Sequence, residues 1–177
     1  MPLIAITGTP GTGKTAAAAE LRRRGYEVAD LSRHIGDHGL KGEFDASRDT
    51  FAVDVEALKA SFGRAGAGDG TVFVEGHLSH HLDCDAAIVL RCHPERLAAR
   101  LRSRGYAEGK VRENVQAEVL DVILCEAAGS GMRVHELDST DTPADAIAGM
   151  IIDIVNGDEA LHGPGSTDWS GEMDRWF

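Results

Sequence analysis

Lysine is scarce in this chain of 177 residues, which has only 4 lysines against 14 arginines. Positive charge as a whole is in short supply, because 29 acidic residues outnumber 18 basic ones and leave a net charge of −11. The acidic residues are spread along the chain, which argues against a general attraction to nucleic acid or anionic lipid. A phosphate-bearing ligand must therefore be held locally. An acidic, lysine-poor surface suits a salt-rich cytosol, although a GC-rich genome would also favour arginine over lysine.

Cysteines are few, and long apolar runs are absent. The three cysteines, Cys84, Cys92 and Cys125, form no CxxC pair. An odd number without paired spacing indicates neither a disulfide framework nor a finger-type zinc site. The N-terminus carries no basic leader, and no apolar run approaches the ~20 residues that a membrane span needs. We therefore expect reduced thiols and a soluble, cytoplasmic protein with no membrane partner.

Apolar strand-like segments alternate with amphipathic helical ones along the chain. This alternation predicts a parallel sheet with flanking helices rather than a bundle or a sandwich. The expected strands cover residues 3–7, 26–30, 71–75, 86–91 and 134–137, and the expected helices 13–24, 54–65, 94–105, 111–123 and 143–155. The predicted fold class is thus α/β, with a five-stranded parallel sheet.

Two segments lack such a pattern. Residues 31–50 are polar and are broken by three glycines, and a connection of that length usually serves as a lid or a binding segment. The last twenty residues are rich in Gly and Asp but carry Trp169 and Trp176. This tail is expected either to be disordered or to be docked by its aromatic side chains.

A glycine-rich loop follows the first expected strand. The run Gly8-Thr-Pro-Gly-Thr-Gly-Lys14-Thr15 fits the P-loop pattern GxxxxGK[ST] and lies between a strand and a helix, as that motif requires. Its glycines let the backbone wrap a phosphate, while the loop amides and the helix N-terminus face it with positive dipoles. Lys14 should reach the β and γ oxygens of ATP, and the Thr15 hydroxyl should bind Mg²⁺.

Glu75 ends the expected strand 71–75 and is followed closely by His77. Both side chains should emerge at the carboxyl edge of the sheet, where open α/β folds bind ligands. A carboxylate there can hold Mg²⁺ or its waters, and His77 could order the attacking group. A surface acid and a structural histidine are the alternative interpretations.

Two further groups of side chains stand out. His77, His80, His81 and Cys84 are close in sequence, but their spacing matches no standard zinc set, so a zinc site is not the favoured interpretation.

Arg96, Arg100 and Arg104 recur along one helix face. Arg96 is expected to be solvated, whereas Arg104 lies beside Gly105 and could close over the transferring phosphates. Arg33 and Arg48 lie in the broken segment and could grip a second phosphate-bearing substrate; a surface role for each stays open.

These motifs together resemble the adenylate kinase 6 type of nucleoside monophosphate kinase, the family of coilin-interacting nuclear ATPase and its archaeal relatives. The matching segments run in family order along the chain: GTPGTGKT at 8–15, VADLSR at 28–33, VEGH at 74–77, IVLRC at 88–92, RLRSRGY at 100–106 and ENVQAEVL at 113–120. The resemblance implies an adenylate-kinase-like P-loop NTPase fold over residues 1–156. It also implies an AMP-binding segment at 31–54, a very short lid at 103–113 and an acidic tail at 157–177.

The resemblance also assigns roles by position. ATP would be contacted by Gly11, Gly13, Lys14, Thr15, Ala16 and Arg104. Glu75 and His77 would form the catalytic edge with Lys14 and Arg104, and Thr15 and Glu75 would hold Mg²⁺. The chain departs from eukaryotic members at Glu75, where they have Asp, and at Ala16, where they repeat Thr. The longer acid could hold the metal through water.

The implied activity is conversion of ATP and AMP, or another nucleoside monophosphate, to diphosphates, with slow ATP hydrolysis alongside. The family also assists maturation of the small ribosomal subunit by binding a ribosomal protein of its platform. One alternative is an assembly ATPase in which AMP phosphorylation is incidental, and another is a kinase for a different small acceptor. The arginines of residues 31–50 favour a kinase, because a purely hydrolytic switch does not need them there.

Overall fold

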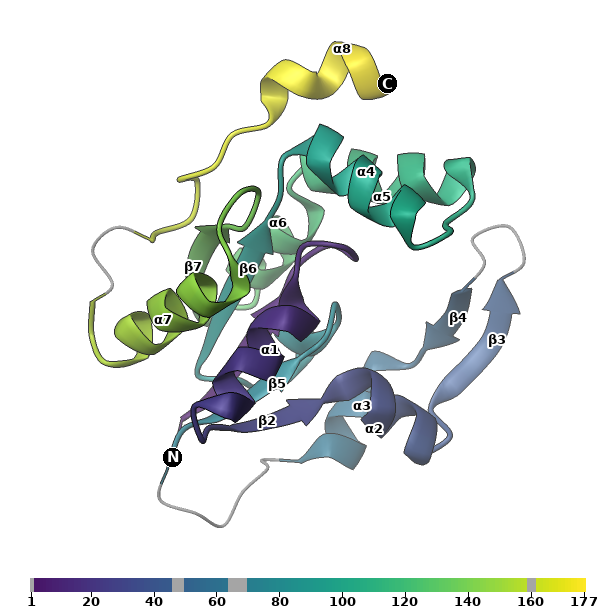
Figure 1. Ribbon diagram of the computed structural model, residues 1–177. Coiled ribbons are helices and arrows are strands. Elements are labelled where there is room, and N and C mark those ends of the chain that lie inside the picture. The colour runs from purple at the N-terminus through teal and green to yellow at the C-terminus, as the bar shows by residue number, and fades with distance from the viewer. Residues whose placement is uncertain (1, 46–49, 64–69, 159–161) are drawn as a thin grey trace.

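The computed structural model describes residues 2–45, 50–63, 70–158 and 162–177 (Figure 1). Its centre is a sheet of five parallel strands in the order β2-β5-β1-β6-β7. The strands are β1 (Leu3–Thr7), β2 (Glu27–Asp30), β5 (Val72–Glu75), β6 (Ala86–Arg91) and β7 (Arg133–Asp138). The predicted α/β fold is confirmed. Because all five strands run the same way, their carboxyl ends meet at one edge of the sheet.

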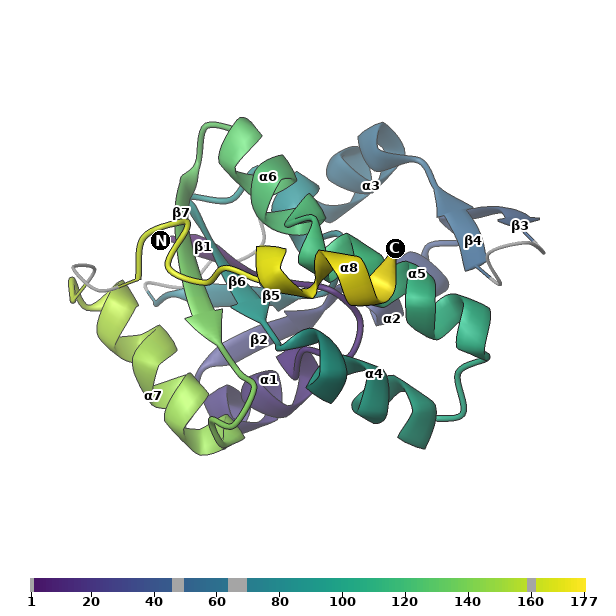
Figure 2. The same ribbon diagram turned by 90° about the horizontal axis from the view of Figure 1, so that it is seen from above.

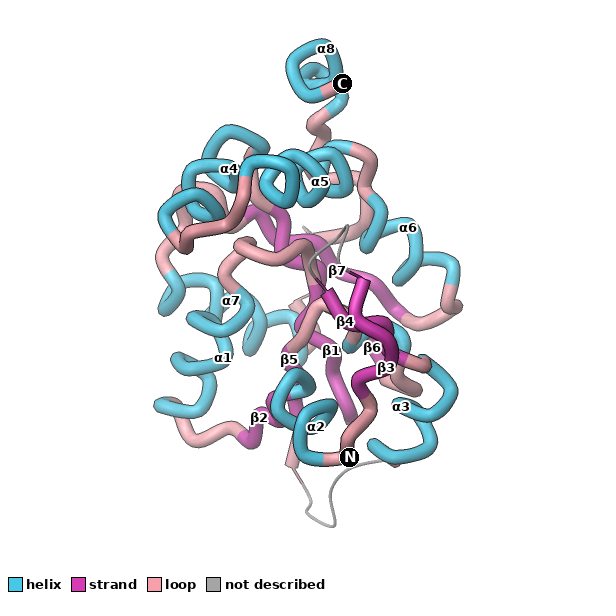
Figure 3. The backbone as a smooth tube through the Cα atoms, turned by 90° about the vertical axis from the view of Figure 1, so that its right-hand side faces the viewer, coloured by secondary structure: helices cyan, strands magenta, loops and turns pink. Residues whose placement is uncertain are grey.

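Helices cover both faces of this sheet, as Figure 2 and Figure 3 show from two directions. One face carries α1 (Lys14–Arg23) and α7 (Ala144–Val155); the other carries α2 (Leu31–Asp37), α3 (Val55–Phe62) and α6 (Val122–Gly129). Side chains of β1 alternate between the two cores, with Ile4 and Ile6 on the α1 face and Leu3 and Ala5 on the α6 face. A strand buried on both faces reads as a continuous apolar run, which is why β1 was easy to predict.

A third apolar cluster lies beyond the carboxyl edge of the sheet. Helices α4 (Pro94–Ser103) and α5 (Glu108–Val119) pack together, and the short helix α8 (Met173–Trp176) lies across them (Figure 1). Leu97 and Leu101 of α4 meet Val111 and Val115 of α5. Trp176 closes the cluster and is only 9% exposed. Of the two expectations for the tail, docking by an aromatic side chain is therefore the one observed.

The segment predicted to be a broken loop contains regular structure. It forms α2 and then an antiparallel hairpin of β3 (Lys41–Asp45) and β4 (Thr50–Val53), which projects away from the main sheet (Figure 1). The Asp30 carboxylate caps α2 by accepting the Arg33 N–H at 2.9 Å. Sequence polarity concealed these elements because they bury few side chains. Arg48 lies outside the described residues.

The prediction of a single helix over residues 111–123 is wrong, because this part of the chain forms two helices. The chain breaks between α5 and α6, where Asp121 adopts a left-handed conformation with φ 55°. The Asp121 carboxylate forms an ion pair with Arg91 at the end of β6. A long-range contact thus overrides a local helical pattern.

None of the helices in the described part of the chain has both the length and the apolar character needed to cross a membrane.

Candidate active site

A cavity of about 950 Å³ opens at the carboxyl edge of the sheet. It is bounded by the glycine loop, by the ends of β2 and β5, and by the turn between α4 and α5. Its walls include the predicted site residues Gly11, Gly13, Lys14, Thr15, Glu75, His77 and Arg104. Segments far apart in sequence therefore converge on one space, as expected for ligand sites in open α/β sheets.

The glycines of the loop serve two different purposes. A Cβ on Gly8 would lie 2.4 Å from a backbone carbonyl oxygen of β6, and one on Gly11 would lie 2.8 Å from Leu97 and 3.0 Å from Leu101. At these two glycines the space beside the missing Cβ is filled by other parts of the protein, so both are needed for close packing of the loop. Gly13 has φ 96° and no atom within 4 Å of its missing Cβ, so the space beside it is open.

Lys14 is held within the glycine loop. Its Nζ donates to the carbonyl oxygens of Gly8 at 2.6 Å and Thr9 at 2.9 Å, and the residue is buried. Burial lowers the pKa of Lys14 to about 8, although the negative charge of Glu75 opposes the shift. The positive charge of Arg104 adds to the lowering, so the two cations act on the same space. Such a concentration of positive charge suits an anionic ligand.

Glu75 lies beside Asp30, because β2 and β5 pair with these two residues in register. Burial, and next the charge of Asp30, raise the pKa of the Glu75 carboxyl, while a hydrogen bond with the Thr15 side chain opposes that shift. Asp30 lines the cavity but was not predicted as a site residue. The sequence pattern could have indicated Asp30, because it ends its strand at the same edge of the sheet as Glu75 does.

His77 faces the cavity, whereas His80, His81 and Cys84 do not line it. Partial burial lowers the pKa of His77 to about 4, and nearby positive charges, including that of Lys14, add to the effect, although the residue keeps an exposed surface. The ring is therefore neutral near pH 7. His80 instead approaches Thr7 Oγ1 at 2.9 Å through Nδ1, and the Cys84 thiol points to the carbonyl of Ser79. The four residues weighed as a zinc set do not converge.

The arginines of α4 differ in their surroundings. Arg104 caps the helix and lines the cavity, as predicted. Arg96 is solvated and pairs with Asp141 at 2.6 Å, which confirms its expected surface position. Arg100 donates to the carbonyl of Ser139 at 2.8 Å and to that of Gly11 at 3.4 Å, so it braces the glycine loop.

Arg33, by contrast, is not brought into the cavity. Its side chain is 80% exposed and lies 3.4 Å from Asp37 on α2.

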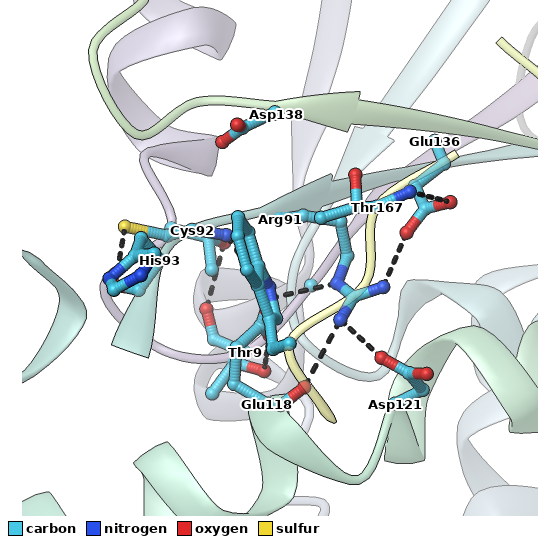
Figure 4. Close-up of polar contacts among 12 residues, drawn as sticks. Thr9, Arg91, Cys92, His93, Glu118, Asp121, Glu136, Asp138 and Thr167 are labelled. Carbon is cyan, nitrogen blue, oxygen red and sulfur yellow. Dashed lines mark hydrogen bonds and ion pairs between the residues drawn. The ribbon is translucent and has the colours of Figure 1, made fainter. Parts of the chain in front are cut away.

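A buried network of charged side chains contacts the glycine loop (Figure 4). Arg91 is 1% exposed and contacts the carboxylates of Glu118, Asp121 and Glu136. Glu118 accepts from Arg91 Nε at 2.8 Å and, through its other oxygen, from the Thr9 hydroxyl at 2.5 Å. A residue of the glycine loop is thereby tied to the end of β6. Sequence reasoning missed this network because its members are far apart in the chain.

The tail joins the same network. Glu136 Oε2 accepts backbone N–H bonds from Gly165 at 2.8 Å and Ser166 at 2.9 Å, and the Trp169 indole approaches Glu118 at 3.4 Å. These donors compensate carboxylates that a single arginine cannot neutralise.

A second cavity of about 320 Å³ lies on the other side of the glycine loop. Its walls combine the backbone of the loop with α4, the segment after β7 and the start of α7. Gly11, Gly13 and Arg104 line both cavities, and Ala16 lines this one. The two spaces are therefore neighbours that share walls.

The chain matches known proteins along most of its length. Residues 4–121 match the family model described as "AAA domain". A "Putative adenylate kinase" of Archaeoglobus fulgidus is 42% identical over 97% of this chain and 94% of its own length. Another, of Methanothermobacter thermautotrophicus, is 46% identical over 96% of this chain and 98% of its own length. Among solved structures, a shikimate kinase from Acinetobacter baumannii superposes with a TM-score of 0.63 at 15% identity, covering 90% of this chain and 96% of that one.

The structural likeness shows the fold alone, whereas the two archaeal relatives are similar in sequence from end to end. The chain therefore belongs to the archaeal "Putative adenylate kinase" family of P-loop phosphotransferases.

Proposed function

We propose that the chain transfers the γ-phosphoryl group of ATP to a nucleoside monophosphate, with ATP and AMP giving two ADP. The observation that carries this proposal is the extent of the larger cavity, which joins the glycine loop to Asp30 and Ser32 at the start of α2. Hydrolysis needs only a phosphate cradle and a water molecule. A cavity of about 950 Å³ that reaches a second segment supports a second substrate.

The shared walls of the two cavities support a position for ATP. Its triphosphate would lie along the amides of the glycine loop, where Gly13 leaves room. Its base would enter the smaller cavity, beside Ala16 and Ile147. Arg104 lines both spaces and would contact ATP along its length.

The residues expected to hold Mg²⁺ fit that ion chemically. The Thr15 hydroxyl meets the Glu75 carboxylate, and oxygen donors of this kind are those that Mg²⁺ prefers. Burial and the charge of Asp30 raise the pKa of Glu75. Two carboxylates side by side concentrate negative charge, which a bound divalent cation would neutralise. When bound, Mg²⁺ would neutralise charge on the phosphates.

Phosphoryl transfer in this site would depend on how the two substrates are positioned and on stabilisation of the negative charge of the transferring group. Lys14, Arg104 and the loop amides would stabilise negative charge on the transferring group. The attacking oxygen of a monophosphate is already ionised near neutral pH, because its second pKa is about 6. No general base is then required, and the neutral His77 would orient the reacting groups.

The monophosphate would be bound by residues 31–54, and residues 103–113 would serve as the lid. Both segments belong to the kinase domain of residues 1–156, on which the described part of the tail, residues 162–177, packs. Arg33 would have to leave Asp37 and turn inward, and Arg48 belongs to the same segment. If Arg33 grips the acceptor, Arg33→Ala raises the KM for AMP and leaves the KM for ATP unchanged.

Two other interpretations use the same cradle. In the first, the chain is an assembly ATPase that acts with a ribosomal platform protein; this rests on the sequence resemblance alone. In the second, it phosphorylates a different small acceptor. Both predict that AMP leaves the rate of ADP formation unchanged.

The test is to follow ADP formation from ATP and Mg²⁺ with and without AMP, CMP and other acceptors. We expect a rate that depends on a monophosphate and that Lys14→Ala abolishes. Arg104→Ala should lower kcat by about 100-fold with a smaller effect on ATP affinity. Arg96→Ala is the matched control, because this arginine of the same helix pairs on the surface with Asp141. Residual hydrolysis that no acceptor stimulates would reject the kinase proposal.

A further inference from the structure

Two histidines and a glutamate converge outside both cavities. His80 and His81 lie on the short 3-10 helix η1 (Ser79–His81), and Glu126 lies on α6. Glu126 Oε2 is 3.0 Å from His80 Nε2 and 3.9 Å from His81 Nε2. One ligand atom from each of the three residues falls within 4.8 Å of the others. The third member was invisible in the sequence, because it comes from a separate helix.

The contacts of His80 are compatible with a ring tautomer suited to metal binding. Thr7 Oγ1 lies 2.9 Å from His80 Nδ1 and donates to the carbonyl of His77 at 3.4 Å. In the tautomer in which Thr7 donates to that carbonyl, the hydroxyl accepts the Nδ1 proton of His80, and a lone pair on Nε2 faces Glu126. In that tautomer, a cation between the lone pair and the carboxylate would stabilise the arrangement. Metal-binding histidines show the same arrangement, with the second ring nitrogen donating to an oxygen.

We propose that His80, His81 and Glu126 bind one Zn²⁺ ion, with water as the fourth ligand. Two imidazoles and a carboxylate are a ligand set that Zn²⁺ accepts, with bonds of about 2.0–2.2 Å. Ligand atoms around such an ion lie roughly 3.3 Å apart, close to the 3.0 and 3.9 Å separations found here.

The proposed ion would tie η1, which follows the Glu75 edge, to α6 on the sheet face. Buried His80, 1% exposed, already contributes to packing, so its replacement would confuse folding with binding. His81 and Glu126 are more exposed, with side-chain accessibilities of 29% and 47%, and can be changed with little effect on the core. The site is independent of nucleotide binding, because none of its residues lines either cavity.

The test is calorimetric titration of the full chain with Zn²⁺ near neutral pH, without nucleotide and with excess Mg²⁺ to occupy oxygen-only sites. We expect one Zn²⁺ per chain and a rise in the unfolding temperature. His81→Ala and Glu126→Gln should each weaken binding by about tenfold or more. His38→Ala is the matched control, because His38 and His34 are another pair of neighbouring histidines, with ring centroids 4.0 Å apart, at the end of α2.

Substitution of Co²⁺ for Zn²⁺ gives a second readout, since a tetrahedral site produces intense visible absorption that both variants should abolish. The proposal is overturned if Zn²⁺ does not bind saturably. It is equally overturned if binding survives both His81→Ala and Glu126→Gln. In either case a proton on His80 Nε2, donated to Glu126, accounts for the cluster.

Discussion

Among single residues, Glu118 links three parts of the molecule. Its carboxylate accepts from Thr9 in the glycine loop, from Arg91 at the end of β6 and from Trp169 in the tail. A buried carboxylate is stable only when its lone pairs are satisfied in this way. Glu118 thus fixes the loop indirectly and is a positioning residue.

Replacement of Glu118 by Gln should be costly. The amide keeps one acceptor oxygen but removes the charge that Arg91 Nε contacts at 2.8 Å. We expect the free energy of unfolding, measured by urea denaturation, to fall by about 1–3 kcal/mol. Glu108→Gln on the same helix is the control, because its ion pair with Arg102 is exposed and should contribute little. Equal losses in the two variants would contradict the role of the network.

The cysteines should differ sharply in reactivity. Burial raises the pKa of the Cys92 thiol to about 11, whereas Cys125 is exposed on α6. Because the thiolate is the reactive form, alkylation of the folded protein at pH 8 should modify Cys125 and leave Cys92 intact. Peptide mass mapping of protein alkylated with and without urea identifies which cysteine is modified. Labelling of Cys92 in the folded protein at the rate seen in urea would contradict its burial.

For helices and strands, the sequence pattern predicts the features that depend on residues close together in the chain. The P-loop motif, the apolar run of β1 and the strand ending at Glu75 depend on neighbouring residues, and all three were placed correctly. The break at Asp121 depends on Arg91, thirty positions away, and no local pattern reports it. The same reason concealed the contact between Thr9 and Glu118, which are separated by 109 positions.

The junction of the loop with α4 can be tested through its glycines. Gly11→Ala would place a methyl group 2.8 Å from Leu97, in addition to the strain of φ 96°. Gly13→Ala carries the same strain at φ 96° but meets no atom within 4 Å. We therefore expect Gly11→Ala to lower stability by about 1–3 kcal/mol more than Gly13→Ala in thermal unfolding. A larger loss for Gly13→Ala would mean that α4 does not pack on the loop.

In the whole molecule, the tail holds together elements from distant parts of the chain. Residues 165 and 166 bind Glu136 of β7, while Arg112 and Gln116 of α5 donate to the carbonyl of Trp176. The last helix thereby covers the α4–α5 pair, whose connecting turn borders the larger cavity (Figure 1). The tail is part of the packed structure.

The two final aromatic residues provide a matched test of this docking. Trp176 is 9% exposed and Phe177 is 59% exposed. Trp176→Ala should lower the free energy of unfolding by about 3–5 kcal/mol, as for other buried aromatic residues. Phe177→Ala should change it by less than about 0.5 kcal/mol, as is usual for surface substitutions. Denaturation curves that are identical for both variants would show that the tail is not docked in solution.

Salt should stabilise the whole molecule. A net charge of −11 repels itself in dilute buffer, and salt shortens the reach of that repulsion from about 10 Å at 0.1 M to about 3 Å at 1 M. We expect the unfolding temperature to rise from low salt to molar KCl. A maximum in low salt, with a steady fall toward molar salt, would refute the idea of a salt-adapted surface.

In the proposed reaction, Lys14 and the glycine loop direct the γ-phosphoryl group of ATP to a nucleotide rather than to water. The most direct measurement follows ATP labelled at its γ phosphorus in a single turnover with AMP and Mg²⁺. We expect the label to appear in ADP made from AMP, and Lys14→Ala to prevent this. Label recovered as inorganic phosphate at the same rate with and without AMP would contradict it.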